Sequence, residues 1–485
     1  MHLLNFSQLR NHDWLMTLII VVLLSLGVIT IFSTTLNSVS EAQGAGTLPK
    51  QLIFVVVGLI VYFFISTIQI SWLQTQFFQV IVYIFIIFSL VLVLLVGQNI
   101  AGTNRWIDIG FFSFQPSEYA KIALIIITAG IFTNDDTKLA PNSGIKLTRS
   151  KLKKTKGLDG RLNWLKSDHA HIWKLVISTL TAIPLIFLTL IQPSLGNAVI
   201  ISLIWLIIVF SLFPNQKRLM QVIVLLGSFL LIISELFTIS RDAYTLSMNF
   251  TPETIDLFTL AVGISGILIV SFVGRIKIKF LLLLPLISLT LLFATVTVWN
   301  TQITNYQKDR IDVFLSGPES DPYDGGYQVR QSKIAIGSGR LMGRGFLEGT
   351  QSSLNVLTQS HTDFIFAAMS EQFGFVGSSI LLLLYIILII RILKIGFSSS
   401  TSFGRVVALG IATMILLHIF INVGMNLGQL PVTGIPLPLV SYGGNSVLVN
   451  LISLGIVQSI AGSKRAVDIS DSLMLRSQSR LYQQN

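Results

Sequence analysis

A polar, glycine-rich stretch in a largely apolar chain holds the residues best suited to chemistry. It runs from Gly317 to Gln328 and contains Asp321, followed by a proline and then a Gly-Gly pair. These neighbours favour a turn that presents the carboxylate. A lone Asp-Pro is often only a turn former, but a carboxylate among cations suits a phosphorylated substrate that also needs a general base. The neighbouring cations are Arg310, Arg330, Lys333, Arg340 and Arg344.

A second polar segment combines two cations with a carboxylate. Glu118 and Lys121 lie one turn apart on a predicted helix whose first turn holds Pro116. A lysine so deep in an apolar run needs a partner, which Glu118 can supply. Arg105 is expected nearer the surface, where it could contact the pair or a phosphate. The alternative is a structural ion pair that pins a loop to a helix, and both interpretations stay open.

A third segment, from Gln429 to Gly444, cannot form a regular helix because it holds three prolines and three glycines. Irregular backbone at membrane depth is tolerated only against protein or water. We therefore expect a re-entrant loop that lines a cavity. His418 and Asn422 on the preceding helix are expected to hydrogen-bond into this loop, as a buried, satisfied pair rather than a catalytic one.

The end of the large polar loop holds His361, Thr362 and Asp363, and Glu371 follows. Thr362 or Asp363 is expected to cap a helix. His361 could bind a ligand or carry a proton, although a surface histidine that forms hydrogen bonds is the simpler interpretation. Glu371 could orient a substrate or pair with a loop cation.

Two Gly-x-Gly sequences in the same loop could bind a phosphate. Gly337-Ser-Gly339 and Gly343-Arg-Gly345 could each form a nest of backbone N–H groups, although such a short pattern has little specificity.

The elements that must position these residues are membrane helices. The chain has 52% hydrophobic and 11% charged residues and a mean hydropathy of +0.76, values typical of a polytopic α-helical membrane protein. We predict twelve transmembrane helices, at 14–33, 51–68, 77–96, 118–133, 174–191, 196–213, 219–239, 257–274, 280–299, 374–393, 404–424 and 445–462.

The basic residues predict the orientation. The loop 134–174 holds ten Lys and Arg residues and is expected in the cytoplasm, with both termini. The predicted order is helices one to four with outer loop 97–117 (1–133), a basic cytoplasmic loop (134–173), helices five to nine (174–299), a large extracytoplasmic loop (300–373), helices ten to twelve with loop 429–444 (374–465) and a cytoplasmic tail (466–485).

Composition also excludes several functions. The net charge of +11 comes mainly from cytoplasmic loop edges that face anionic headgroups, so nucleic-acid binding is not expected. The chain has no Cys, which rules out disulfides, thiolate catalysis and Cys-based metal sites. No internal repeat or inverted pair of broken helices of the transporter kind is evident.

Several motifs together resemble the SEDS (shape, elongation, division, sporulation) family, in order from the first helix to the last. The resemblance is closer to the elongation branch than to the division branch. Its residues are Asp13-Trp14, Gly102 to Trp106, Gln115 to Lys121, Asp321 to Gln328, Gln331 to Gly339, His361 to Phe366, Pro431 to Pro438 and Ser441 to Gly444.

The resemblance implies a ten-helix core plus two extra helices in the bacterial inner membrane. It also implies a peptidoglycan glycosyltransferase, active on the extracytoplasmic face, that polymerises lipid II with inversion and releases undecaprenyl pyrophosphate. Asp321 matches the family's essential carboxylate. Implied partners are a class B penicillin-binding protein and other elongation-complex membrane proteins, and a divalent cation such as Mg²⁺ is an open cofactor. Arg105, Glu118, Lys121, Arg330, Lys333 and His361 are the substrate-site candidates.

Three departures limit what the resemblance carries over. Ser194 stands where the family usually has Asp, so the role of that position is in doubt. Leu357-Thr-Gln359 replaces a Leu-Pro-Glu sequence, and Arg340 replaces a common Gly.

Two other functions also stay open: a lipid II flippase or other transporter, which would need polar residues along its helices, and a non-catalytic scaffold of the cell-wall complex.

Overall fold

The computed structural model describes residues 12–36, 46–100, 103–108, 110, 113–138, 159–192, 194–212, 310, 313–314, 317, 325–353, 356–357 and 359–482. Residues 1–208 and 304–485 form one compact unit, and residues 209–303 form a second. Only 209–212 of the second unit are described.

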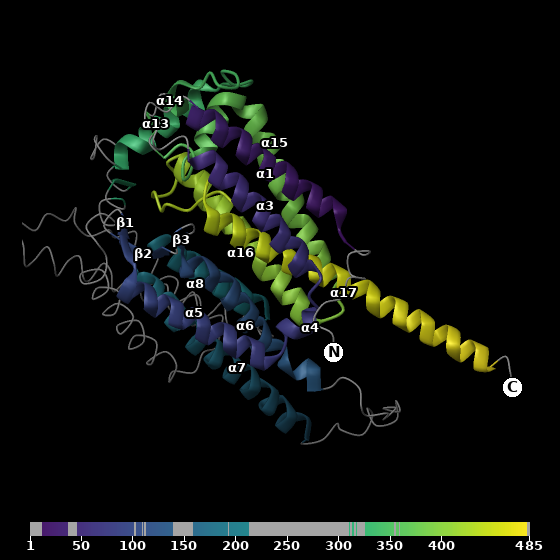
Figure 1. Cartoon of the computed structure of the whole chain (residues 1–485). Coiled ribbons are helices and arrows are strands. Elements are labelled where there is room, and N and C mark those ends of the chain that lie inside the picture. The colour runs from purple at the N-terminus through teal and green to yellow at the C-terminus, as the bar shows by residue number, and fades with distance from the viewer. Residues whose placement is uncertain are drawn as a thin grey trace, which may run out of the picture. The chain divides into compact units, whose positions relative to one another are not determined.

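Within the described residues, nine helices are long and apolar enough to cross a membrane (Figure 1). Each coincides with a predicted span, which confirms a helical, multi-pass chain. The predicted spans 219–239, 257–274 and 280–299 lie outside the described residues, so the number twelve stays a prediction. The nine are α1 (Trp14–Leu36), α3 (Thr47–Ser66), α5 (Gln76–Val96), α6 (Pro116–Lys138), α7 (Asp159–Ile191), α8 (Leu195–Leu212), α15 (Ile365–Phe397), α16 (Ser402–Asn426) and α17 (Gly444–Tyr482).

The shorter elements lie in the connections. They are the helices α4 (Ile70–Leu73), α13 (Gly325–Ser338) and α14 (Thr350–Ser353) and the strands β1 (Gln98–Ile100), β2 (Thr103–Asp108) and β3 (Ser113–Phe114). The strands form an antiparallel sheet in the order β1-β2-β3, in which Ile107 pairs with Phe114. The sequence analysis placed only a loop at 97–117. It missed the sheet because three very short strands give no clear alternation of apolar and polar residues.

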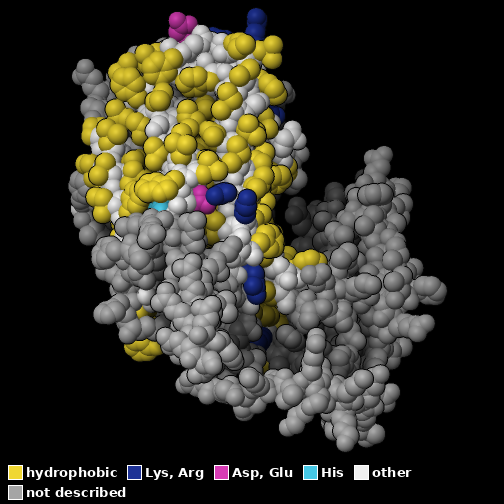
Figure 2. All heavy atoms as spheres, turned by 90° about the vertical axis from the view of Figure 1, so that its right-hand side faces the viewer, with side chains coloured by type: hydrophobic (Ala, Val, Ile, Leu, Met, Phe, Trp, Pro, Cys, Tyr) yellow, Lys and Arg dark blue, Asp and Glu magenta, His cyan; other side chains and the backbone are white. Residues whose placement is uncertain are grey.

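The membrane-spanning helices differ in how much of each helix is buried inside the protein. The spans of α6, α16 and α17 are 83%, 72% and 78% buried, whereas that of α3 is only 17% buried. Figure 2 shows hydrophobic side chains covering one face of the described part, with charged side chains at its upper and lower margins. An apolar exterior with charged ends is expected where lipid is the solvent.

The long helix α15 contains a break at Gly374, which has φ +65° and ψ −163°. The predicted span began at 374, so it recovered the part beyond the break and missed the buried turns at 365–373. A glycine-rich turn, residues 339–345, packs against the break. Its Arg344 and Gly345 N–H groups donate to the carbonyls of Glu371 and Gln372, at 2.9 and 3.1 Å.

These bonds contradict the predicted phosphate nests. The Gly339 and Gly343 N–H groups donate to the carbonyls of Ala335 and Gly339, at 3.2 and 2.7 Å. With Arg344 and Gly345 also engaged, this backbone is committed to the fold. The Gly-x-Gly pattern could not reveal these hydrogen bonds, because the acceptor carbonyls of residues 371 and 372 are distant in sequence.

Glu371 also differs from both of its predicted roles. Its buried carboxylate accepts hydrogen bonds from the backbone N–H groups of Thr350, Gln351 and Ser352, at 2.7, 2.9 and 3.0 Å. These are the first residues of α14, where unpaired N–H groups favour an anion. Glu371 therefore holds the loop against α15.

Gly343→Ala tests the close packing of the turn. Gly343 has φ +84°, and an added Cβ would overlap the Gln372 carbonyl. We expect a loss of about 2–4 kcal/mol in unfolding free energy, from left-handed strain plus overpacking. The measurement is thermal unfolding of the purified protein in detergent.

Gly337→Ala is the matched control. A Cβ at Gly337 meets nothing within 4 Å, and the residue is helical. We expect a gain of about 0.5–1 kcal/mol, as for other helix glycines. Equal effects of the two changes would contradict the packing described for residue 343.

Candidate active site

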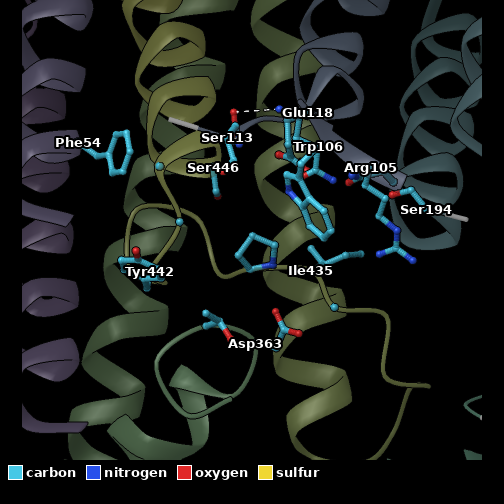
Figure 3. A pocket seen from close by; sticks show the side chains of 18 of the residues that line it. Phe54, Arg105, Trp106, Ser113, Glu118, Ser194, Asp363, Ile435, Tyr442 and Ser446 are labelled. Atoms are coloured by element: carbon cyan, nitrogen blue, oxygen red, sulfur yellow. Dashed lines mark hydrogen bonds between the residues drawn. The ribbon is translucent and has the colours of Figure 1, made fainter. Parts of the chain in front are cut away.

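A cavity of about 350 Å³ lies where the ends of several helices meet the irregular loops. Its walls come from the starts of α3, α6, α8 and α17, from β2 and β3, from the segment before α15 and from the Pro/Gly loop before α17 (Figure 3). This size is typical of small-molecule pockets. The polar lining includes Arg105, Glu118, Ser194, Asn197, Asp363 and Tyr442.

A buried ammonium group lies directly beneath this cavity. Lys121 Nζ donates to Glu118 Oε2 at 2.9 Å and to Asn197 Oδ1 at 3.2 Å, and it lies 2.8 Å from His418 Nε2. All four side chains are buried, and Lys121 is fully so. The predicted pairing of Glu118 with Lys121 is therefore confirmed, while a functional role for the pair stays a proposal.

The histidine in this network has an assignable tautomer. His418 Nδ1 lies 2.6 Å from the Met414 carbonyl, which can only accept, so Nδ1 carries the proton. His418 Nε2 is then the acceptor for Lys121. The sequence analysis expected His418 to reach the Pro/Gly loop, which is wrong because Lys121 occupies it.

Asn422, by contrast, does reach the Pro/Gly loop as predicted. Its Nδ2 donates to the carbonyls of Ile435 and Asp363, at 2.8 and 2.9 Å. The loop backbone is further held by Tyr442 N–H, which donates to the His361 carbonyl at 2.9 Å. Ile435 and other residues of this non-helical loop line the cavity, so the prediction of an irregular, cavity-lining segment is confirmed, while its re-entry into the membrane stays a prediction.

Asp363 is the cavity residue that the sequence analysis missed. It was interpreted as a possible helix cap, but the cap position of α15 is Phe364, without a side-chain cap bond. The Asp363 carboxylate faces the cavity instead (Figure 3). Burial raises its pKa, and the nearby Arg310 and Arg105 oppose that rise. Only the fold brings Asp363 close to these two arginines, so the sequence alone gave no sign that it belongs to the cavity.

The position of the missing family carboxylate also lines the cavity. Ser194 is buried at the start of α8 and offers a hydroxyl there. Its neighbour Asn197 bonds both Lys121 and Ser117, with Asn197 Nδ2 to Ser117 Oγ at 3.1 Å. At position 194 the cavity wall is therefore polar but lacks the negative charge that an Asp would add.

None of the remaining predicted site residues that the structure describes lines this cavity. Asp321 lies outside the described residues. Arg330 and Lys333 are on α13, and Lys333 lines a smaller hollow that it shares with Arg310. His361 packs edge-on against Tyr442, with ring centroids 5.7 Å apart, and burial lowers its pKa.

Comparison with known proteins places this fold and site in a family. The profile described as cell cycle protein (FtsW, RodA, SpoVE) matches residues 13–256 and 254–466. The chain is 32% identical over 448 residues to the peptidoglycan glycosyltransferase MrdB of Escherichia coli K12, covering 92% of this chain and 93% of that protein. It is 30% identical to the peptidoglycan glycosyltransferase RodA of Treponema pallidum, covering 93% and 97%. Proteins named FtsW match at 28–29%.

A solved structure shows the same fold. The chain matches one titled "Structural coordination of polymerization and crosslinking by a peptidoglycan synthase complex", with a TM-score of 0.58 and 22% identity over 93% of this chain and 98% of that one. The chain is thus a multi-pass membrane protein with the fold of this group. It belongs to the FtsW/RodA/SpoVE family, also called SEDS.

Lys121→Met tests the buried network. The change leaves the Glu118 carboxylate buried without its cation, so we expect a loss of about 3–5 kcal/mol in unfolding free energy. Glu118→Gln combined with Lys121→Met should restore most of that loss, because replacing a whole buried pair is often close to neutral. Thermal unfolding in detergent measures both.

The control is Lys174→Met. Lys174 is half-buried and donates to the Phe132 carbonyl at 3.0 Å. We expect a change of about 1 kcal/mol or less. A Lys121 variant as stable as this control would mean that the network does not hold the helices together.

Proposed function

We propose that the protein is a peptidoglycan glycosyltransferase that polymerises lipid II into glycan strands during cell elongation. The observation that carries this proposal is a polar cavity, lined by Lys50, Arg105, Glu118 and Asp363, at the end of a membrane bundle, in a chain 32% identical to a peptidoglycan glycosyltransferase. Such a cavity suits a substrate that has a phosphate group and is anchored in lipid.

In the proposed reaction, the GlcNAc 4-hydroxyl of one chain attacks C1 of the MurNAc of another with inversion. The hydroxyl proton passes to the Asp321 carboxylate, which acts as general base, and undecaprenyl pyrophosphate leaves. Asp321 precedes α13 by four residues. The proposed role gains support from Ser332 of α13, which donates to the Asn426 carbonyl at 2.8 Å, while Asn426 Nδ2 donates to the Asp363 carbonyl at 3.0 Å. These contacts tie α13 to the cavity wall.

The cations of the cavity would stabilise the charge that develops on the pyrophosphate. Arg105 lines the cavity, and Arg310 lies near its Asp363 wall, with Nη1 bonded to the Val432 carbonyl at 3.0 Å. Asp363 would position both guanidinium groups. Preorganised charges of this kind stabilise a leaving group without further reorganisation. Glu118 and Lys121 would shape the same wall, with Arg330, Lys333 and His361 as weaker candidates.

A divalent cation such as Mg²⁺ stays a prediction from the resemblance. Among the described residues, no three His, Asp or Glu side chains gather as protein ligands of a metal would. The steps above therefore use only the side chains of this chain.

The proposed topology has twelve helices, both termini in the cytoplasm and the cavity on the extracytoplasmic face of the inner membrane. The ion pair between Asp13 and Arg391, at 2.8 Å, supports a common side for the start of α1 and the end of α15. Arg391, Lys394 and Arg405 lie at that end, as expected for a cytoplasmic side. A class B penicillin-binding protein and other elongation-complex proteins are the proposed partners, in keeping with the synthase complex named for the matched structure.

Asp321→Asn tests the proposed reaction. We expect purified wild type, with a transpeptidase-inactive penicillin-binding partner, to make glycan strands from lipid II. The variant should lose at least about a hundredfold in rate, because it lacks the base. Gel separation of the strands measures the outcome.

The two other functions give different results in the same assay. A scaffold predicts that Asp321→Asn changes nothing that the protein does. A flippase predicts no strands from either protein while lipid II still crosses the membrane of vesicles. Equal polymerisation by both proteins would remove Asp321 from the mechanism.

A further inference from the structure

The turn at 339–345 is joined to α15 on both sides of the break at Gly374. Beyond the break, the N–H groups of Phe375 and Val376 have no helical partners and donate to the carbonyls of Arg340 and Leu341, at 2.9 and 3.1 Å. The turn also packs closely on the helix, because a Cβ added at Gly374 would overlap the Leu341 carbonyl. The turn therefore lies at the same height along the axis of α15 as the break at Gly374.

This turn carries large apolar side chains that face outward. Leu341 and Met342 are 67% and 78% exposed, and Phe346 is exposed beside them. Phe375 and Val376, which begin the outward face of α15, are exposed as well. The apolar surface of the turn is thus continuous with the membrane-facing surface of the helix, and a patch of this kind marks an interaction site.

Helix length places the turn at a membrane boundary. From Lys394 to Gly374, α15 rises by about 30 Å, which matches the thickness of the hydrocarbon core. Lys394 marks the opposite interface together with Arg391. Figure 2 shows hydrophobic side chains continuing up to the upper margin, which is the α13–α14 end of the molecule in Figure 1.

Two exposed arginines flank the apolar tip. Arg340 and Arg344 are both exposed, with one carboxylate, Glu348, exposed nearby. Arg340 has φ +46°, a conformation that glycine adopts more easily. Cations beside an apolar tip are the pattern of a membrane-interface anchor for anionic lipid.

We propose that residues 340–346 form an interfacial anchor in the outer leaflet. The side chains of Leu341, Met342 and Phe346 insert below the headgroups, and Arg340 and Arg344 bind the phosphates of anionic phospholipids. Since the turn follows α13 directly, the anchor fixes the height of that helix above the bilayer. This surface is separate from the cavity, and its assignment to the outer leaflet rests on the proposed topology but not on the proposed reaction.

Spin labelling tests the anchor directly, because the chain has no Cys. Met342→Cys is labelled and reconstituted in nanodiscs that contain phosphatidylglycerol. Label collisions with lipid-soluble oxygen and with a water-soluble nickel chelate are then compared. The references are Leu383→Cys on the exposed face of α15 and Ser400→Cys in the exposed turn at its other end. We expect the Met342 label to collide several-fold less with the chelate than the Ser400 label does.

The charge contribution is tested with Arg340→Gln combined with Arg344→Gln in the Met342→Cys background. In the parent, replacing phosphatidylcholine by phosphatidylglycerol should lower chelate access, and in the double variant that lipid dependence should disappear. A Met342 label as accessible to the chelate as Ser400 would overturn the anchor. So would a label that is protected only when the penicillin-binding partner is added, because this result would assign the surface to a protein.

Discussion

The fold depends on how one positive charge is accommodated inside a membrane bundle. The Lys121 ammonium group is fully buried, and its three acceptors come from α6, α8 and α16. An unpaired ammonium there would cost several kcal/mol, so the three helices must meet at this point. Glu118 and Asn197 are fixed by the same bonds and also line the cavity. One electrostatic requirement thus both joins the core helices and shapes the wall of the site.

Irregular backbone forms the rest of the site, and hydrogen bonds to other parts of the protein hold it at several points. Asn422 and Asn426 hold the carbonyl of Asp363. The turn at 339–345 replaces the helical hydrogen bonds lost at Gly374. These arrangements let non-helical segments lie beside a membrane without exposing N–H or C=O groups to lipid. They also explain how a carboxylate such as Asp363 can be presented at the end of an apolar bundle.

Local patterns in the sequence predicted much of this structure. Apolar run lengths located the described spans, the spacing of Glu118 and Lys121 gave their pairing, and the prolines of 429–444 gave an irregular, cavity-lining loop. Apart from the short β-strands, the failures share one cause, which is a partner distant in sequence. The sequence could not pair Lys121 with His418 or Glu371 with the start of α14. Nor could it bring Asp363 beside Arg105 and Arg310. Membership of the family confirmed the resemblance, while the roles of single site residues rest on chemistry.

The most direct test of the account is the rate of lipid II polymerisation by Asp363→Asn compared with Asp13→Asn. Both carboxylates lie near arginines, but Asp363 faces the cavity and Asp13 pairs with Arg391 at the opposite end. Asp363→Asn should lower the rate about ten- to hundredfold, because it removes the carboxylate whose charge acts on Arg310 and Arg105, while Asp13→Asn keeps the rate. Because burial raises the pKa of Asp363, wild type should begin to lose activity at a higher pH than the asparagine variant does. Equal rates for both variants, in proteins of equal stability, would contradict the assignment of the reaction to this cavity.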